Sequence, residues 1–336
     1  LQASLRGLKG RYSASVTVPR DRQYVGLDAY RDVLRTAVDL VILASPPGFR
    51  PLHFDAAVRA GKHVFLEKPV AVDPAGVRRV LSCSQHAQRQ GLAVAVGLQR
   101  RHQQRYRETI QRLHEGTIGD IILTRVYWNG ESPVANSRRK AQTELEYQLR
   151  NWHWFTWLGG DLIVDRLVHG LDVINWLKNG YPVSAQGQGG RLNNTEADPG
   201  EIFDHQMVEF TYDDGSKLFA QCRHSRNMVH QVAEHAHGTR GTAHIGAATI
   251  RDMNGQVSWS FGRGGGAGQP QEMIELLRHL RQGNRPNEGT YGAGSTLTAI
   301  LGRMATQSGQ LVTWDQALNC QHALARFEQF TNLQDQ

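Results

Sequence analysis

The segment of residues 38–70 constrains the fold most, because two short apolar runs in it flank one helical pattern. The run at residues 40–44 has no polar interruption, which is typical of a parallel strand buried on both faces. A helical pattern at 50–60 follows a Pro-Pro-Gly turn and ends at Gly61, and 63–66 is the next apolar run. The pattern predicts a right-handed βαβ unit with ligands beyond the carboxyl ends of its strands.

The same alternation continues beyond this unit. Residues 73–90 and 106–115 have helical spacing, and residues 92–96 form another apolar run between them. Repeated strand and helix patterns indicate an open parallel sheet of an α/β domain, similar to a Rossmann fold. We assign this partial dinucleotide-binding domain to residues 1–118.

The second part of the chain has a different pattern. Residues 121–129, 207–212 and 217–222 are rich in β-branched and aromatic residues, and Asp213-Asp214-Gly215 between the last two is a hairpin signal. Further strands are expected at 242–250 and 256–261, and helices at 162–177 and 272–281. We therefore expect an α+β domain at residues 119–336, with a mostly antiparallel open sheet and helices on one face.

Charge and cysteine content exclude several classes of protein. The excess of 38 Lys and Arg over 31 Asp and Glu gives a net charge of +7, but the basic residues are scattered in small groups. The three cysteines are far apart, and no cluster has the spacing of metal ligands. No apolar stretch approaches the roughly 18 to 20 residues that a membrane span needs. We expect no nucleic-acid partner, no bound metal and no membrane insertion.

A second segment, residues 151–177, contains candidate catalytic residues. Asp165 and His169 are four residues apart, so an α-helix would place them on one face, and Asp172 would follow one turn later. A carboxylate beside an imidazole orients the ring and favours its protonated form, as a general base requires. An ion pair that only stabilises the helix explains the spacing equally well.

These two segments carry a family resemblance. AGKHVFLEKP at residues 60–69, and the series Gly159-Gly160, Asp165, His169 and Asp172, resemble the signature of the Gfo/Idh/MocA oxidoreductases. The resemblance implies a nicotinamide-dependent dehydrogenase of sugars or polyols. By the same resemblance, Lys68 lowers the pKa of the substrate hydroxyl, His169 is the base and Asp165 is its partner. A lysine at position 68 is otherwise an ordinary solvated surface charge.

The resemblance also implies NAD or NADP as cofactor. The glycine-rich turn and first helix that open the family's dinucleotide-binding domain are not recognised in this sequence. Residues 262–267 fit G-x-G-x-x-A but are expected to form a loop, because no strand with a terminal acid follows. We therefore expect weakened or absent cofactor binding, with the following candidate contacts: Ser45, Pro46, Pro47, His53, Glu67 and Lys68.

Other polar and aromatic residues are candidates for substrate binding. Arg100 and Arg101 follow a predicted parallel strand and are placed to meet a carboxylate or hydroxyls, or to form ordinary salt bridges. Trp152 and Trp154 belong either to the core or to a platform for a sugar ring. Asp172 completes this predicted set.

Three functions are compatible with the sequence. The first is an NAD(P)-dependent oxidoreductase that acts on a sugar, polyol or sugar derivative by hydride transfer. The second is an NAD-assisted glycoside hydrolase or lyase of the same superfamily, and the third is a non-catalytic carbohydrate-binding or assembly protein. An exposed sheet face favours a homo-oligomer, a dimer or a tetramer. We expect a cytoplasmic protein, or a periplasmic one if a preceding segment carries an export signal.

Overall fold

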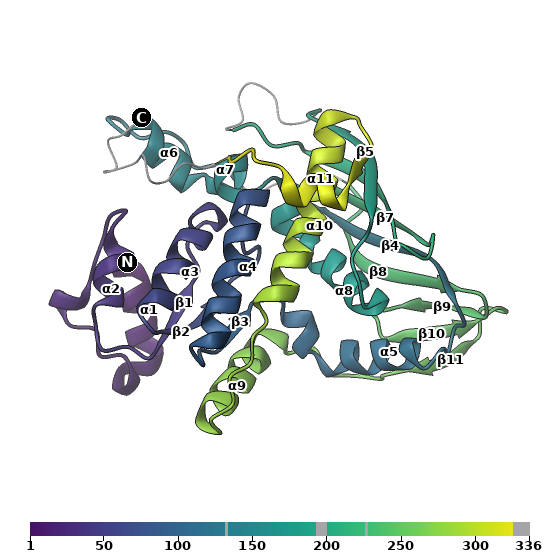
Figure 1. Cartoon of the computed structure of the whole chain (residues 1–336), viewed down its shortest axis with the longest axis horizontal. Helices are drawn as coiled ribbons and strands as arrows, with labels where there is room; N and C mark the ends of the chain where they lie inside the picture. Colours follow the sequence, from purple (N-terminus) through teal and green to yellow (C-terminus); the bar gives the residue numbers. More distant parts are fainter. Residues whose placement is uncertain (132–133, 193–199, 226–227, 325–336) are drawn as a thin grey trace.

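The computed structural model describes residues 1–131, 134–192, 200–225 and 228–324 (Figure 1). The first part contains a parallel sheet in the order β1 (Leu40–Leu43), β2 (His63–Leu66) and β3 (Val94–Val96). Helix α3 (Arg50–Arg59) joins β1 to β2, and α4 (Pro74–Arg89) joins β2 to β3. The predicted βαβ unit is therefore confirmed.

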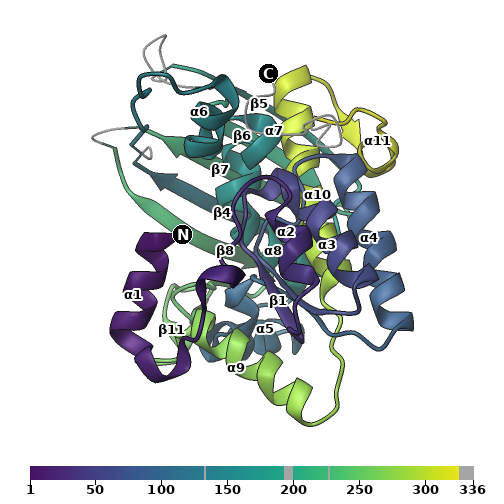
Figure 2. The ribbon, with the colours of Figure 1, turned by 90° about the vertical axis from the view of Figure 1, so that its left-hand side faces the viewer.

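This small sheet is covered on both faces. Val64 and Leu66 face a core shared with α3 and α4, whereas Phe65 packs with Leu276 of α9 (Gly268–Arg281) on the opposite face. Two further helices precede β1: α1 (Gln2–Tyr12) and α2 (Ala29–Leu34). Figure 2 shows α2, α3 and α4 next to one another above β1, and α9 below it.

The second part is built on a nine-stranded sheet in the order β11-β10-β9-β8-β4-β7-β6-β5-β12. Its central strand β4 pairs parallel with β7 and antiparallel with β8. The strands are β4 (Ile121–Gly130), β5 (Ser184–Gly190), β6 (His205–Thr211), β7 (Lys217–His224), β8 (Gln231–Gly238), β9 (Gly241–His244), β10 (Thr249–Asp252), β11 (Val257–Ser260) and β12 (Val312–Thr313). The hairpin predicted at Asp213-Asp214-Gly215 joins β6 to β7. The single strand expected at 242–250 is wrong, because a turn with Ala248 at φ 49° separates β9 from β10.

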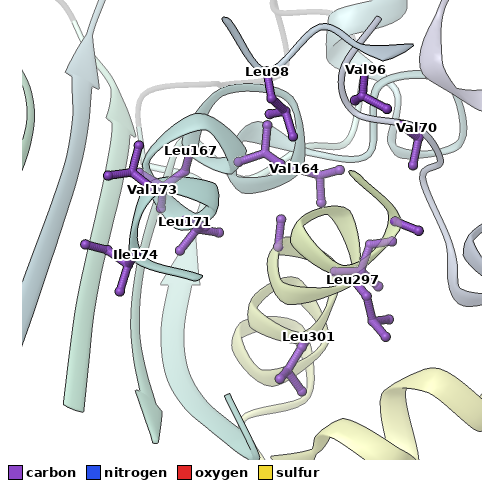
Figure 3. Packing of buried hydrophobic residues seen from close by; sticks show 14 of the residues in the cluster. Val70, Val96, Leu98, Val164, Leu167, Leu171, Val173, Ile174, Leu297 and Leu301 are labelled. Carbon is purple, nitrogen blue, oxygen red and sulfur yellow. The ribbon is translucent and has the colours of Figure 1, made fainter. Parts of the chain in front are cut away.

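Helices cover one face of the large sheet. They include α5 (Gln104–His114), α8 (Val168–Lys178) and α10 (Gly289–Ser308). A Cβ at Gly170 of α8 would lie 2.5 Å from Val126 Cγ1, so glycine permits the close packing of α8 on β4. Leu171 of α8 and Leu297 of α10 belong to one buried cluster (Figure 3). A parallel sheet followed by a mostly antiparallel sheet with helices confirms the predicted fold class.

The last part of the chain returns to the first sheet. Val94 N donates to Pro286 O at 2.8 Å, Glu288 N donates to Val94 O at 2.9 Å, and α10 then packs beside α4. The remaining helices are α6 (Glu144–Arg150), α7 (Thr156–Gly159) and α11 (Trp314–Asn319). The division at residue 118 remains a prediction, since elements from both sides of it share one core.

Candidate active site

Lys68 lies where the two sheets meet. It follows the carboxyl end of β2, and its Nζ donates to Asp165 O at 2.5 Å and lies 3.2 Å from Asp165 Oδ1. The two residues are 97 positions apart in the sequence. Only 16% of the Lys68 side chain is exposed, so the interpretation as a solvated surface charge is wrong. The fold thus brings the two sequence motifs into direct contact.

The backbone around Lys68 is fixed by its neighbours. The buried Arg50 donates to the main-chain oxygens of Ser45 and Pro69, and so ties the ends of β1 and β2 together. Lys68 N donates to Glu67 Oε2 at 3.2 Å. A Cβ at Gly97 would lie 2.7 Å from that same carboxylate oxygen, so glycine leaves room for Glu67. Sequence reasoning missed Arg50, because a residue in a helical pattern gives no sign of contacts with strand ends.

The helix expected at residues 162–177 begins differently. Residues Ile163–Leu167 form a π-helical turn, and only Val168–Lys178 are α-helical. In a π-helix the hydrogen bonds run from i to i+5, so residues four apart no longer stack on one face. No hydrogen bond joins Asp165 to His169 among the described contacts, although Asp165 is close enough to oppose the lowering of the His169 pKa. The hydrogen bonds of this carboxylate are made with other side chains.

Asp165 instead collects three nitrogen-bearing side chains. Besides Lys68, His153 Nδ1 lies 3.2 Å and Arg166 Nε 3.1 Å from its Oδ2. Burial opposes the charge of Asp165, but Lys68, His153 and Arg166 outweigh it and hold the pKa of this carboxyl well below its ordinary value. The Asp165 carboxylate is therefore ionised, and these three side chains meet at it. Sequence reasoning missed His153 and Arg166, although both are direct neighbours of residues it selected.

His169 lies in the first turn of α8 and is 7% exposed. Its ring stacks on Trp128 with 6.0 Å between the ring centres, and its Nδ1 has no hydrogen-bond partner among the described residues. Burial, together with the charges of Lys68 and Arg100, lowers the pKa of His169 well below its ordinary value. The ring is therefore a neutral imidazole, and Lys68 is close enough to act on it electrostatically.

The predicted substrate-binding charges are engaged within the protein. Arg100 forms a buried ion pair with Glu234. Both oxygens of Asp172 accept from Arg101 Nε, at 3.1 and 2.9 Å, and Ser295 Oγ donates to Asp172 Oδ1 at 2.7 Å. The structure thus places these three predicted residues in internal salt bridges.

The tryptophans lie among apolar side chains. Trp154 is 4% exposed and belongs to a core cluster with Phe155 and Leu158. Trp152 packs against the edge of that cluster, and its ring centre lies 3.5 Å from that of His153. The core interpretation therefore describes Trp154, whereas Trp152 supports the ring of a site residue.

The predicted cofactor contacts lie along the end of β1 and the start of α3. Ser45 Oγ lies 3.1 Å from His53 Nδ1, and burial and the charge of Arg50 lower the pKa of His53 to about 4. Pro46 is half-buried and Pro47 is buried. Beside them a groove of about 460 Å³ follows the open edge of β1, with the following lining: Tyr30, Val33, Leu34, Val38, residues 40–45 and His53.

Two further properties concern the described part of the chain. None of its helices has both the length and the apolar character of a bilayer span. No group of three or more His, Cys, Asp or Glu residues in it is arranged to hold a metal ion.

Comparison with known proteins assigns the family. Residues 11–98 match the model of the oxidoreductase family with an NAD-binding Rossmann fold, and residues 106–244 match that of the GFO/IDH/MocA C-terminal domain. Inositol 2-dehydrogenase of Leifsonia xyli subsp. xyli is 27% identical over 238 residues, which cover 70% of this chain but only 62% of that relative. The aldose-aldose oxidoreductase of Caulobacter crescentus, solved with glycerol, has a TM-score of 0.72 at 17% identity and covers 93% of this chain and 89% of its own. A levoglucosan dehydrogenase solved with NADH and levoglucosan has a TM-score of 0.67 at 16% identity over 85% and 83% of the two chains. With both characteristic domains matched in order, the chain belongs to the Gfo/Idh/MocA oxidoreductase family.

Proposed function

We propose that this protein is an NAD(P)-dependent dehydrogenase that oxidises a hydroxyl group of a sugar or polyol. The contact of Lys68 with Asp165, next to the neutral imidazole of His169, carries the proposal. The similarity to an inositol 2-dehydrogenase supports a polyhydroxylated substrate. Within the part of the chain that the structure describes, no specific contact favours a glycoside hydrolase or lyase, or a protein that has lost its activity.

The residues at the strand ends fit the nicotinamide end of such a cofactor. Ser45 offers a hydroxyl, Glu67 sits in the space left by Gly97, and Lys68 points from the same edge into the site. At this edge, the described residues include no glycine-rich turn that leads into a helix N-terminus, the usual holder of a pyrophosphate. When bound, NAD or NADP supplies the acceptor for the hydride. Ser45, Pro46, Pro47, His53 and Glu67 are our proposed contacts.

Lys68 and His169 have different roles in the proposed acid-base catalysis. The Lys68 ammonium, held by Asp165, binds the hydroxyl oxygen of the substrate and stabilises the negative charge that develops there. The hydroxyl proton passes to the neutral ring of His169, the carbon–hydrogen bond breaks as hydride leaves, and a carbonyl group forms. Burial opposes the protonated ring, so His169 holds the proton only until it is passed on.

Replacement of the base tests this assignment. His169→Ala is expected to lower the rate of cofactor reduction by about 10²- to 10⁴-fold with inositols and aldoses as substrates, while the circular dichroism spectrum stays unchanged. The exposed His279 of α9 provides the control, since His279→Ala removes the same group from the protein surface. Activity of His169→Ala within a fewfold of the wild type would show that another group is the base.

The fate of the cofactor separates the alternative functions. Net reduction of added NAD or NADP supports the dehydrogenase. A bound cofactor that is needed for activity but not consumed would indicate NAD-assisted glycoside cleavage. Absence of dinucleotide binding in calorimetry would contradict both enzymes and leave a carbohydrate-binding protein.

We also propose that the face of the large sheet opposite α8 and α10 forms a homo-oligomer, either a dimer or a tetramer. The side chains on this face include Met207, which is 46% exposed, and Tyr127 and Phe219, which are half-buried on β4 and β7. A sheet face with apolar side chains gains stability when a symmetry mate covers it. Light scattering measures the mass in solution, and Phe219→Glu is expected to lower it. A monomeric wild-type protein would contradict this proposal.

A further inference from the structure

We propose that the substrate carries an anionic oxygen group, a carboxylate or a phosphate, and that Arg166 binds this group. The inference rests on the proposed dehydrogenase function and specifies its substrate class. Three observations around Asp165 support it. They are the cationic side chains that contact this carboxylate, the terminal nitrogens of Arg166, and a small polar recess beside His224.

Two cationic side chains contact the single carboxylate of Asp165. Lys68 comes from the end of β2, His153 from the turn before α7, and Arg166 from the π-helical turn, and all three converge on one carboxylate. Asp165 can offset only one of the two charges carried by the Lys68 ammonium and the Arg166 guanidinium. The nearby Asp204 is occupied by His205 Nδ1 at 2.6 Å. The two full positive charges in direct contact with Asp165 therefore exceed the single negative charge of this carboxylate.

Arg166 is anchored at one end and free at the other. Its Nε is held by Asp165, whereas its terminal nitrogens have no acceptor within the described ranges, and 30% of the side chain is exposed. In contrast, the guanidinium of Arg100 is paired with Glu234, and that of Arg101 is paired with Asp172. A guanidinium fixed through Nε presents its terminal nitrogens as a planar donor pair, the geometry that binds carboxylate and phosphate oxygens.

A small polar recess lies next to the Lys68–Asp165 contact. His224 is 5% exposed, and its Nδ1 has no partner in the described structure, as is also true of His169 Nδ1. His224, His153 and Asp165 line a small recess of about 10 Å³, roughly the room of one water molecule. Burial and the charge of Arg166 lower the pKa of His224 to about 4, which indicates that Arg166 lies close to this ring. One water molecule in this recess would satisfy His224 Nδ1, while the anionic group of the ligand pairs with Arg166 outside it.

Matched substrate pairs test the inference. We would measure cofactor reduction with glucose, glucuronate and glucose 6-phosphate, with galactose and galacturonate, and with myo-inositol as a neutral reference. The wild type is expected to have a kcat/KM about ten- to hundredfold higher for the anionic member of a pair. A preference for glucuronate over glucose 6-phosphate would identify the group as a carboxylate, and the opposite order as a phosphate.

The variant Arg166→Gln assigns the preference to this residue. It is expected to raise KM for the anionic substrate by about ten- to hundredfold and to change KM for the neutral one less than threefold, with partial recovery in Arg166→Lys. Arg59→Gln is the matched control, because Arg59 also pairs through Nε with an aspartate but lies on α3 with 74% of its side chain exposed. Equal losses for both substrates, or faster oxidation of neutral sugars by the wild type, would overturn the inference while the dehydrogenase function stands.

Direct binding separates failure of the inference from failure of the proposed function. If no compound reduces the cofactor, the proposed function fails, and saturation-transfer NMR with glucuronate, glucose 6-phosphate and glucose still tests the site. Binding of either anionic sugar that is lost in Arg166→Gln would support an anion site. Equal binding of glucose and both anionic sugars, or binding of none of them, would overturn it.

Discussion

Two charge clusters on the same helical segment differ in how completely they are closed. The first comprises Lys68, His153, Asp165 and Arg166, and the second comprises Arg101, Asp172 and Ser295. We refer to them as the Lys68 cluster and the Arg101 cluster. Both join the first part of the chain to residues 163–178, and both place a carboxylate at the centre of cationic or polar side chains.

The Arg101 cluster is closed. The Asp172 side chain is 1% exposed, both of its oxygens accept hydrogen bonds, and the Arg101 guanidinium lies 4.1 Å from the centre of the Tyr291 ring. The Lys68 cluster is open, since 32% of His153 and 30% of Arg166 remain exposed. A closed cluster has no unused hydrogen-bonding capacity, so its role is to fix the packing, whereas an open one retains donors for a ligand.

Loss of the central cation of the Lys68 cluster should have the largest effect. Lys68→Met is expected to reduce kcat/KM by about 10²- to 10⁴-fold, because the charge that stabilises the developing alkoxide is removed. The melting temperature should change by only a few degrees, since Arg166 still offsets the charge of Asp165 and His153 still contacts it. Steady-state kinetics and calorimetry check the two quantities. A variant that loses stability but keeps its activity per folded molecule would show that this cluster is structural.

The converse change concerns the Arg101 cluster. Asp172→Ala leaves the Arg101 guanidinium largely buried without its carboxylate, which is expected to cost about 3–5 kcal/mol of the free energy of unfolding. Urea denaturation measures this loss. The exposed pair of Arg35 and Asp32 is the control, and Asp32→Ala should cost less than about 1 kcal/mol. If Asp172→Ala instead stays stable and raises KM for the substrate, Asp172 is a substrate ligand as the sequence predicted.

The same contrast explains what the sequence could reveal. Short apolar runs and turn residues predicted the βαβ unit, and the resemblance to two family motifs selected Lys68, Asp165 and His169 as candidates. The partner of each charge depended on tertiary structure, because Arg101 and Asp172 are 71 positions apart. The π-helical turn was not visible in the apolar periodicity, so the α-helical spacing did not reveal that Asp165 pairs with Lys68, His153 and Arg166.

Arg166 shows a second limit of sequence reasoning. An arginine next to a selected aspartate resembles an ordinary solvated charge, and its importance emerges only when Lys68 and His153 are found on the same carboxylate. Conversely, Arg100 and Arg101 followed a strand end as binding residues do, yet carboxylates from distant segments close both of them. Sequence position indicated which charges lie near the site, whereas tertiary contacts decide which remain available.

Two carboxyl groups on α9, Glu272 and Glu275, show the same contrast between unpartnered and paired charges. Their substitution is expected to have the smallest effect. Burial and the neighbouring Glu67 and Glu288 raise the pKa of Glu272 to about 8, and its Oε2 has no partner among the described residues. Arg107 and His102 bind Glu275, three residues further along. Burial alone would raise the pKa of Glu275, but the hydrogen bonds from these partners outweigh it and lower the pKa to about 2. One helix therefore carries a carboxyl group with an unpartnered oxygen and, three residues further along, a carboxyl group that is fully paired.

The pH dependence of stability distinguishes these two groups. Between pH 4.5 and about 8 the folded protein keeps the Glu272 proton that the unfolded chain releases, so this group lowers the stability as the pH rises. Glu272→Gln should therefore be neutral near pH 4 and increase the free energy of unfolding by about 1–3 kcal/mol at pH 8. Glu275→Gln should decrease it at neutral pH, because Arg107 and His102 lose their partner. Urea denaturation at both pH values checks the signs, and a destabilised Glu272→Gln at pH 8 would mean that this carboxyl group has a favourable partner in the folded protein.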